Sequence, residues 1–321
     1  MPAGAASCRA ALTKTAFAQP VGRPGVRSRP RCSHAAAKAK SRRFKPMISG
    51  TTKLIAHLGY PTHSFKAPLI YNPYFEKNDI DAVVVPMGCR PEDYPAFLKL
   101  VFRLSNIHGA LVTMPHKIST MALLGEASKS AQVAGACNAV RLGPNGTLIG
   151  DMFDGEGFVR GVLRRGRQVR GSRAMMIGAG GVGSAIAASL AQAEIAELAL
   201  YDAHVPMMNG LADRLRLHYP TLKVTTGSAD PAGYDIVVNA TPLGMNDNDP
   251  LPLDVSRISP SAFVGEVVLK QEITPFLAAV RARGCEFQVG VDMLFEQIPA
   301  YLEFFGFPTT TAEELRAIAK V

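Results

Sequence analysis

The sequence predicts an α/β protein built from two domains, and three observations lead to this prediction. Its 321 residues suit two domains of ordinary size, and 47% of them are hydrophobic, enough for substantial cores. Short apolar runs alternate with longer amphipathic stretches from Lys53 onwards. A glycine-rich segment near residue 180 then opens a second series of the same alternation, which predicts a second domain.

The first series predicts an α/β domain in residues 47–153, with parallel strands joined by helices. Strands are expected at Lys53–Leu58, Asp81–Pro86 and Ala110–Met114, and helices at 67–77 and 92–104. The second series predicts a doubly wound domain in residues 154–288. Its strands are expected at Ala174–Ile177, Leu198–Tyr201, Lys223–Thr226, Asp235–Asn239 and Phe263–Val268, and its helices at 182–193, 208–217 and 274–283. One further helix is expected at Met293–Phe305, within a segment, 289–321, that closes back onto the first domain.

The net charge of +9 comes from the N-terminal segment rather than from the two domains. Residues 1–46 contain 11 of the 35 Lys and Arg residues and no acid, which leaves 24 basic residues against 26 acidic ones. This segment has no apolar period, so we expect disorder. An over-long start or an appended extension is the favoured interpretation, with a cytoplasmic protein; the alternatives are an organellar transit peptide and a basic arm for nucleic acid. Because the remainder is nearly neutral, no nucleic-acid partner is expected.

Other composition features narrow the class further. The five cysteines are scattered and form no CxxC pair, which is typical of a reducing compartment. No apolar run reaches the roughly 20 residues of a membrane span, so no membrane partner is expected. The seven histidines are dispersed and no carboxylate spacing suggests a metal site, so no metal is predicted.

A glycine-rich loop predicts a dinucleotide site of the Rossmann type. Gly178-Ala179-Gly180-Gly181-Val182-Gly183 follows an apolar strand and opens an Ala-rich helix. The first glycine permits a tight turn, the second lets a pyrophosphate approach the backbone, and the third lets helix and strand pack closely. The helix N-terminus then offers N–H groups to the phosphates. Asp202 lies 19 residues after Gly183, at the end of the next strand, where a carboxylate accepts hydrogen bonds from the adenosine ribose.

Two segments before this loop contain a candidate proton-transfer pair. Lys117 ends Val-Thr-Met-Pro-His-Lys (112–117), and Asp154 lies in Gly-Asp-Met-Phe-Asp-Gly-Glu-Gly (150–157). Hydride transfer from an alcohol needs a base for the hydroxyl proton and a hydride acceptor close to the carbon. In this order, the segments and the loop resemble the shikimate/quinate dehydrogenase family from about Lys53 to Phe305.

The resemblance implies roles for these residues. Lys117 would be the catalytic base during oxidation and Asp154 its partner. Burial would lower the pKa of the amine and the carboxylate would raise it, and the sequence leaves open which effect dominates. Thr113, Asn138 in Gly-Ala-Cys-Asn-Ala-Val and Gln297 match substrate-binding positions of the family. The segment Asn239-Ala-Thr241-Pro-Leu-Gly-Met245 resembles the family loop beside the nicotinamide.

The resemblance also implies which cofactor is used. Most shikimate dehydrogenases have an Asn-Arg-Thr sequence after the second strand and use NADP, whereas the matching positions here are Tyr201, Asp202 and Ala203. The Arg that would bind a 2′-phosphate is missing and the carboxylate repels that group. NAD is therefore favoured over NADP.

The pattern breaks where the family holds the substrate carboxylate. The family loop has two Ser hydroxyls at positions that become Phe65 and Ala67 in Gly59-Tyr-Pro-Thr-His-Ser-Phe-Lys-Ala-Pro68. His63, Ser64 and Lys66 are candidate replacements. Leu111 and Leu269 stand where the family has Asn and Tyr. Each lost donor costs about 1–3 kcal/mol if its partner is left unpaired.

These observations predict an NAD(P)-dependent dehydrogenase of a small hydroxy acid, monomeric or homodimeric, with an accessory role favoured over a biosynthetic one. Its substrate is shikimate, quinate or another hydroxy acid. A ligand-binding regulator without turnover is the alternative from another class. Methylenetetrahydrofolate and amino-acid dehydrogenases share the two-domain layout but match the Lys117 and Asp154 segments less well.

Overall fold

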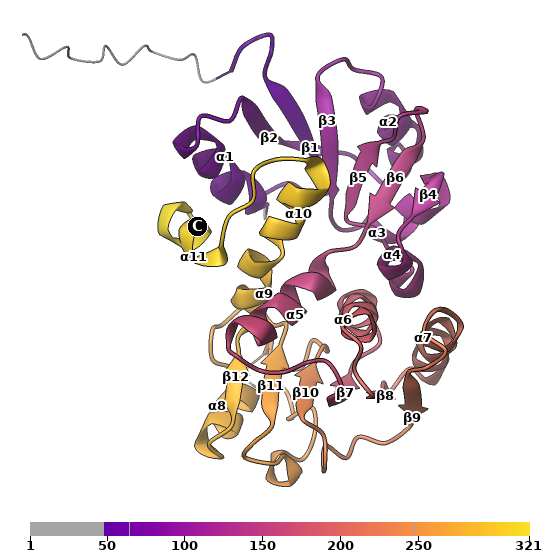
Figure 1. Ribbon diagram of the computed structural model, residues 1–321, viewed down its shortest axis with the longest axis vertical. Helices are drawn as coiled ribbons and strands as arrows, with labels where there is room; N and C mark the ends of the chain where they lie inside the picture. Colours follow the sequence, from indigo (N-terminus) through magenta and orange to yellow (C-terminus); the bar gives the residue numbers. More distant parts are fainter. Residues whose placement is uncertain (1–47, 64, 247) are drawn as a thin grey trace, which may run out of the picture. The chain divides into compact units, whose positions relative to one another are not determined.

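A computed structural model describes residues 48–63, 65–246 and 248–321 (Figure 1). The predicted basic tail, residues 1–46, and the candidate residue Ser64 lie outside this part of the chain. The two predicted α/β series are present as two six-stranded sheets. No helix in the described ranges is long and apolar enough to cross a membrane.

The first sheet has the strand order β2-β1-β3-β5-β6-β4. Its strands are β1 (Lys53–Gly59), β2 (Ala82–Gly88), β3 (Ile107–Val112), β4 (Glu126–Ala127), β5 (Ala139–Leu142) and β6 (Leu148–Asp151). β1 pairs in parallel with β2 and β3, as predicted. The helices of this part are α1 (Ala67–Lys77), α2 (Tyr94–Val101), α3 (Lys117–Thr120) and α4 (Lys129–Ala134).

Two details of this sheet differ from the prediction. The expected strand Ala110–Met114 begins earlier, at Ile107, and ends at Val112. Pro115 fits this early end, because a proline has no N–H to donate to a strand ladder. The sheet is also not wholly parallel, since β5 runs antiparallel to both β3 and β6. The β5–β6 hairpin closes through Gly146, which adopts φ +73°, a conformation that glycine accepts without strain.

The second sheet has the order β12-β11-β10-β7-β8-β9, and all of its pairs are parallel. Its strands are β7 (Arg173–Ile177), β8 (Glu197–Tyr201), β9 (Lys223–Thr226), β10 (Ile236–Asn239), β11 (Phe263–Glu266) and β12 (Glu286–Gln288), and its helices are α6 (Gly181–Gln192), α7 (Val205–His218) and α8 (Pro275–Ala282). Numbered from β7, this is the 3-2-1-4-5-6 order of a Rossmann sheet. The strand order reverses between β7 and β10, although all the strands are parallel.

Helix α5 (Asp154–Arg164) connects the two sheets along the chain and packs on α6 and α9 (Gly290–Glu296). Close backbone contact with α6 requires glycine at 155, because a Cβ there would lie 2.0 Å from the Ala185 carbonyl oxygen. The contact also buries the start of α5. Asp154, its first residue, is thereby held in a fixed position.

The C-terminal helices complete the core of the first sheet rather than the second. Phe295, Tyr301, Phe305 and Leu315 join Ile55 and other residues of β1, α1 and β3 in one buried cluster. The single helix predicted at Met293–Phe305 is wrong: α9 ends at Glu296 and α10 (Ile298–Phe305) begins after Gln297. Pro299 accounts for the break because it has no N–H to donate to the preceding turn. A final helix, α11 (Ala312–Ile318), packs against α1 and lies beside it in Figure 1.

Candidate active site

The β5–β6 hairpin brings Asn138 beside the start of α5. The backbone N–H of Asn138 donates to the Asp151 carbonyl at 3.0 Å, which ties the start of β5 to the end of β6. Fully buried, Asn138 accepts the Phe153 N–H at its side-chain oxygen, 3.0 Å away. Its amide donates to Oδ1 of Asp154 at 2.9 Å. The carboxylate of Asp154 is thus oriented before any ligand arrives.

Lys117 and Asp154 form an ion pair, 37 residues apart in sequence. Nζ of Lys117 donates to Oδ2 of Asp154 at 2.6 Å. The Asp154 side chain is 8% exposed and that of Lys117 is 24% exposed, so the pair is partly shielded from water while the amine remains accessible. An accessible amine in contact with a buried carboxylate has the geometry to exchange a proton with a ligand hydroxyl.

The backbone around Lys117 is held by its neighbour His116. The His116 ring stacks on the Tyr94 ring, with centroids 3.9 Å apart, and its Nε2 contacts the Cys89 carbonyl at 2.8 Å. The Lys117 carbonyl in turn accepts the N–H of Cys137 at 2.9 Å, which joins the Lys117 and Asn138 segments directly. Position 117 is therefore fixed from both sides.

Six buried side-chain polar atoms among the described residues have no hydrogen-bond partner, and three of them are Nδ1 of His57, the Tyr71 hydroxyl and Oε1 of Gln297. His57 lies on β1 and is 7% exposed, and burial together with the positive charge of Lys117 lowers its pKa to about 4. Tyr71, on α1, is 2% exposed, and burial raises the pKa of its hydroxyl. Each atom therefore has unused hydrogen-bonding capacity.

Several predicted substrate residues lie at more exposed positions than these atoms. His63 and Lys66 are exposed on the loop before α1. Thr113 follows β3 and packs against Gly59, where an added Cβ would lie 2.5 Å from its methyl carbon. Phe65 covers the His57 ring at a centroid separation of 4.1 Å. The loop thus has the aromatic ring of Phe65 at a position where the family has a Ser hydroxyl.

The glycine-rich loop has the conformation that its spacing predicted. Gly178 adopts φ +102°, and a Cβ at Gly183 would lie 2.1 Å from the Gly178 carbonyl oxygen, so both positions require glycine. At Gly180 and Gly181, by contrast, an added Cβ would meet no atom within 4 Å. The open space lies at the N-terminus of α6, where backbone N–H groups have no helical partner. This arrangement fits the pyrophosphate of a dinucleotide.

Asp202 and the loop after β10 flank the glycine-rich loop. The Asp202 carboxylate accepts the N–H groups of Ala179 and His204, each at 2.7 Å, and so stands beside the loop at the end of β8. Asn239 is fully buried, and its polar atoms bond the Thr241 hydroxyl at 2.6 Å and the Leu243 carbonyl at 3.1 Å. It therefore shapes this loop from beneath. Met245 is 44% exposed on the same loop.

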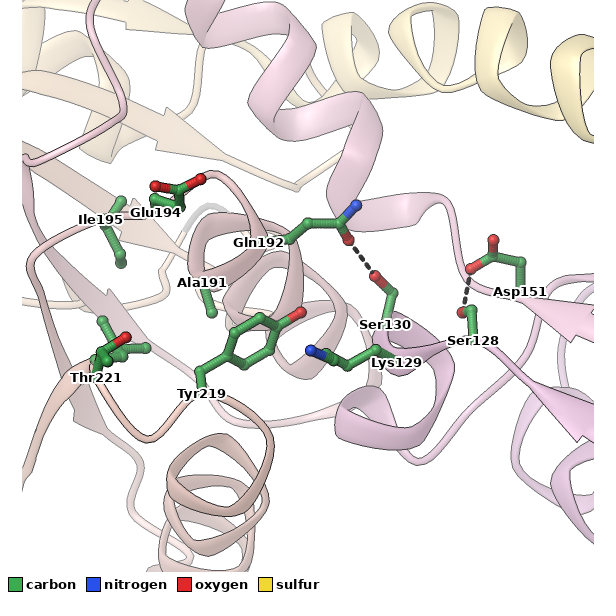
Figure 2. A pocket seen from close by; sticks show the side chains of 11 residues that line it. Ser128, Lys129, Ser130, Asp151, Ala191, Gln192, Glu194, Ile195, Tyr219 and Thr221 are labelled. Atoms are coloured by element: carbon green, nitrogen blue, oxygen red, sulfur yellow. Dashed lines mark hydrogen bonds between the residues drawn. The ribbon is translucent and has the colours of Figure 1, made fainter.

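A cavity of about 620 Å³ outside this site is lined by none of the predicted site residues. It lies among α4, the end of α6 and the end of α7, as Figure 2 shows. Ser130 donates to Gln192 at 2.7 Å across it, and the Lys129 ammonium lies 5.1 Å from the centre of the Tyr219 ring. In the described part of the chain, no group of three His, Cys, Asp or Glu residues is arranged to hold a metal ion.

Sequence reasoning missed His57 and Tyr71. A histidine in the apolar run of β1 was a usable signal, because polar residues inside buried strands need a reason. Tyr71 gave no comparable signal, since a tyrosine in an amphipathic helix is ordinary. Leu111, which stands where the family has Asn, is in register with His57 on the neighbouring strand.

Comparisons with known proteins agree with this fold and motif set. Residues 58–140 match the shikimate dehydrogenase substrate binding domain. Shikimate dehydrogenase (NADP(+)) of Acidiphilium cryptum is 33% identical over 276 residues, covering 85% of this chain and 98% of that protein. The corresponding enzyme of Rhodospirillum rubrum is 31% identical, covering 84% and 98%.

Solved structures show the same fold. Shikimate 5-dehydrogenase from Listeria monocytogenes, in complex with shikimate and NAD, gives a TM-score of 0.79 at 24% identity, covering 84% of this chain and 97% of that one. Quinate dehydrogenase from Corynebacterium glutamicum, in complex with NAD, gives 0.74 at 27% identity, covering 83% and 98%. The chain therefore belongs to the shikimate dehydrogenase family, a family of NAD(P)-dependent oxidoreductases that act on CH–OH groups.

Proposed function

We propose that this protein oxidises and reduces a small hydroxy acid of the shikimate or quinate type, with Lys117 and Asp154 handling the proton. The observation that carries the proposal is the 2.6 Å contact between the amine and the buried carboxylate. The pair is oriented by Asn138 and lies at the carboxyl end of the first sheet. A second support is the open glycine loop of the second sheet.

Each residue has a distinct part in the proposed reaction. Nζ of Lys117 takes the hydroxyl proton as the alcohol becomes a ketone, and returns it in the reverse direction. Oδ2 of Asp154 accepts a hydrogen bond from the amine, which orients its lone pair or proton. Gln297 and Thr113 hold other substrate hydroxyls, and Asn138 acts through Asp154. The bound nicotinamide would supply or accept the hydride.

The residues of the second sheet are proposed to hold the dinucleotide. The N–H groups of Gly181, Val182 and Gly183 face the pyrophosphate, and Gly178, Ala179 and Gly180 shape the turn. Asp202 accepts the ribose hydroxyls, while Thr241 and Met245 border the nicotinamide. The carboxylate at Asp202 supports NAD over NADP. The similar proteins from A. cryptum and R. rubrum bear the name NADP(+), so cofactor choice needs its own measurement.

The test is cofactor reduction, followed by the nicotinamide absorbance, with shikimate and quinate offered alongside NAD and NADP. Wild-type protein is expected to turn over at least one acid, and Lys117→Ala is expected to lower kcat by about 10²–10⁴. Lys77→Ala, at the exposed end of α1, is the matched control and should keep full activity. Unchanged turnover in Lys117→Ala would remove the amine from the mechanism. Ligand binding without turnover of any acid would instead favour a regulator.

A further inference from the structure

The interior of the substrate site contains two polar side chains that the proton-transfer scheme does not use, His57 and Tyr71. They come from β1 and α1, which are adjacent through the cluster formed by Ile55, Tyr71 and Leu111. His57 lies in register with Leu111 on β3, the strand that leads to Lys117. Both residues are more than nine-tenths buried, yet one ring nitrogen and one hydroxyl are unpartnered.

These two side chains lie within electrostatic reach of the Lys117–Asp154 pair, directly for His57 and through Tyr301 for Tyr71. The positive charge of Lys117 acts on the His57 ring and opposes its protonation. On the other side, Tyr301 of α10 feels the charge of Asp154 and also lies close to Tyr71. Both rings are buried in the first core, whereas His63 and Lys66 are exposed.

A buried polar atom without a partner is costly. A lost hydrogen bond of this kind typically costs about 1–3 kcal/mol, and buried tyrosine hydroxyls nearly always find a partner. Among the described residues, Tyr74 shows the contrast one turn further along α1: its hydroxyl donates to the Pro308 carbonyl at 2.6 Å. Tyr71 lies on the same helix and in the same core, but its oxygen meets no backbone carbonyl or other hydrogen-bond partner.

The electrostatic setting indicates which ligand group fits. Burial is the first cause of the lowered pKa of His57, and the positive charge of Lys117 is the second. The contribution of Lys117, which disfavours an imidazolium, favours an anion at the same place. A phenol and an imidazole N–H both donate well to a carboxylate, and hydrogen bonds to an ionised acceptor are the stronger kind.

We propose that His57 and Tyr71 form the carboxylate anchor of this protein's substrate pocket. The Tyr71 hydroxyl donates to one carboxylate oxygen and the His57 ring to the other, and Phe65 is the side chain that the ligand displaces from the His57 ring. This anchor rests on the proposed function, because it assumes that the hydroxy acid binds beside Lys117. It assigns the carboxylate to β1 and α1 and not to the exposed residues of the loop before α1.

The experiment compares each acid with its methyl ester in wild-type protein, Tyr71→Phe and His57→Gln. Shikimate and quinate are the acids, and KM and kcat are measured separately. Wild-type protein is expected to prefer the acid, and each variant to raise KM for the acid roughly tenfold with kcat nearly unchanged. KM for the ester should hardly move. Tyr74→Phe and His108→Gln are the controls, because each removes a polar group bonded elsewhere in the first core.

A folding control accompanies the kinetics. Removing the unpartnered hydroxyl in Tyr71→Phe is expected to leave the Tm of the free protein unchanged or higher, whereas Tyr74→Phe should lower it. An equal effect of Tyr71→Phe and His57→Gln on acid and ester, or no effect on either, overturns the anchor.

Binding separates failure of the anchor from failure of the proposed reaction. If wild-type protein reduces no cofactor with either acid, calorimetric titration of shikimate and quinate in the presence of NAD replaces the kinetics. Acid binding that weakens in Tyr71→Phe but not in Tyr74→Phe supports the anchor even though the reaction has failed. Absence of acid binding to wild-type protein overturns both.

Discussion

Asn138 donates its side-chain amide to Oδ1 of Asp154, which leaves Oδ2 to meet the Lys117 amine. The same Asn138 side chain accepts the N–H of Phe153, so it forms two hydrogen bonds with the start of α5. Orientation of the acid is thus a property of the β5–β6 hairpin and not of the ligand. Groups locked in place before binding lower the barrier more than groups that must be ordered during it.

Asn138→Ala should therefore lower both activity and stability. The Phe153 N–H and one oxygen of Asp154 lose their partners, at a cost of about 1–3 kcal/mol in the free energy of unfolding. We expect kcat to fall roughly tenfold or more, because Asp154 is free to turn. Urea denaturation and steady-state kinetics measure the two effects. Asn72→Ala is the control: Asn72 makes two equivalent bonds to the Val84 backbone away from the pair, so stability should fall while kcat holds.

Two glycines of the nucleotide loop should respond differently to alanine. At Gly183 the new Cβ would lie 2.1 Å from the Gly178 carbonyl oxygen. Gly183→Ala should therefore lower the free energy of unfolding of the free protein by about 1–3 kcal/mol, and its Tm should fall accordingly. At Gly180 the space is empty and φ is −68°, so Gly180→Ala should leave the Tm nearly unchanged. Its methyl would nevertheless occupy the place proposed for the pyrophosphate. NAD titration should therefore show weaker binding in Gly180→Ala, and unchanged affinity there would place the pyrophosphate elsewhere.

Asp202→Asn tests the choice of cofactor. The amide keeps an oxygen that can accept the Ala179 N–H but removes the negative charge. Loss of repulsion toward a 2′-phosphate should raise kcat/KM for NADP relative to NAD by about tenfold, which corresponds to about 1.4 kcal/mol. The ratio is read from reduction of the two cofactors under one set of conditions. Asp213→Asn, on the exposed side of α7, is the charge-matched control. A wild-type protein that already prefers NADP would contradict the prediction from Asp202.

His57 should make the folded protein sensitive to mild acid. Burial and the charge of Lys117 lower its folded pKa to about 4, against an ordinary value of 6.5. Between pH 6.5 and pH 4, His57 is protonated in the unfolded chain but not in the folded one. Its contribution to the free energy of unfolding is therefore fully present above pH 6.5 and is lost as the pH drops toward 4. The loss from this residue is about 3 kcal/mol at most.

Denaturation at pH 7.5 and pH 5 measures this dependence. His108 and His116 also have lowered pKa values from burial and add to the same slope. His57→Gln should therefore flatten the dependence without abolishing it. A variant with the full wild-type slope would show that His57 is protonated as readily in the folded protein as in the unfolded chain.

The sequence was sufficient for the fold wherever periodicity and turn residues agreed. Helix α1 has the predicted limits, 67–77, because Pro68 starts it and a polar stretch ends it. The strands around the glycine loop were also placed to within a residue or two. The β5–β6 hairpin was not predicted. Its strands are four residues long, and unlike the equally short β10 each contains a charged residue, Arg141 or Asp151, which interrupts the apolar run.

Which residues belong to the site was easier to predict from the sequence than where each side chain lies within it. The motifs selected Lys117, Asp154 and Asn138 from the sequence, and these three do meet. The carboxylate-binding groups were expected in the loop at residues 59–68, yet the unpartnered polar atoms of His57 and Tyr71 lie on β1 and α1. Which side of a strand His57 faces depends on register with β3, and that register is a property of the folded sheet.

The return of α10 and α11 to the first core has a consequence for synthesis. The apolar face of β1 and α1 is covered by Phe295, Tyr301, Phe305 and Leu315, which are synthesised after every strand of both sheets. The strands of the second sheet are all made before those residues, so the nucleotide half can assemble while the first half still has a bare flank. A nascent chain stalled near residue 290 would thus present an apolar surface to chaperones, and the substrate half can close only after residues 295–315 have been made.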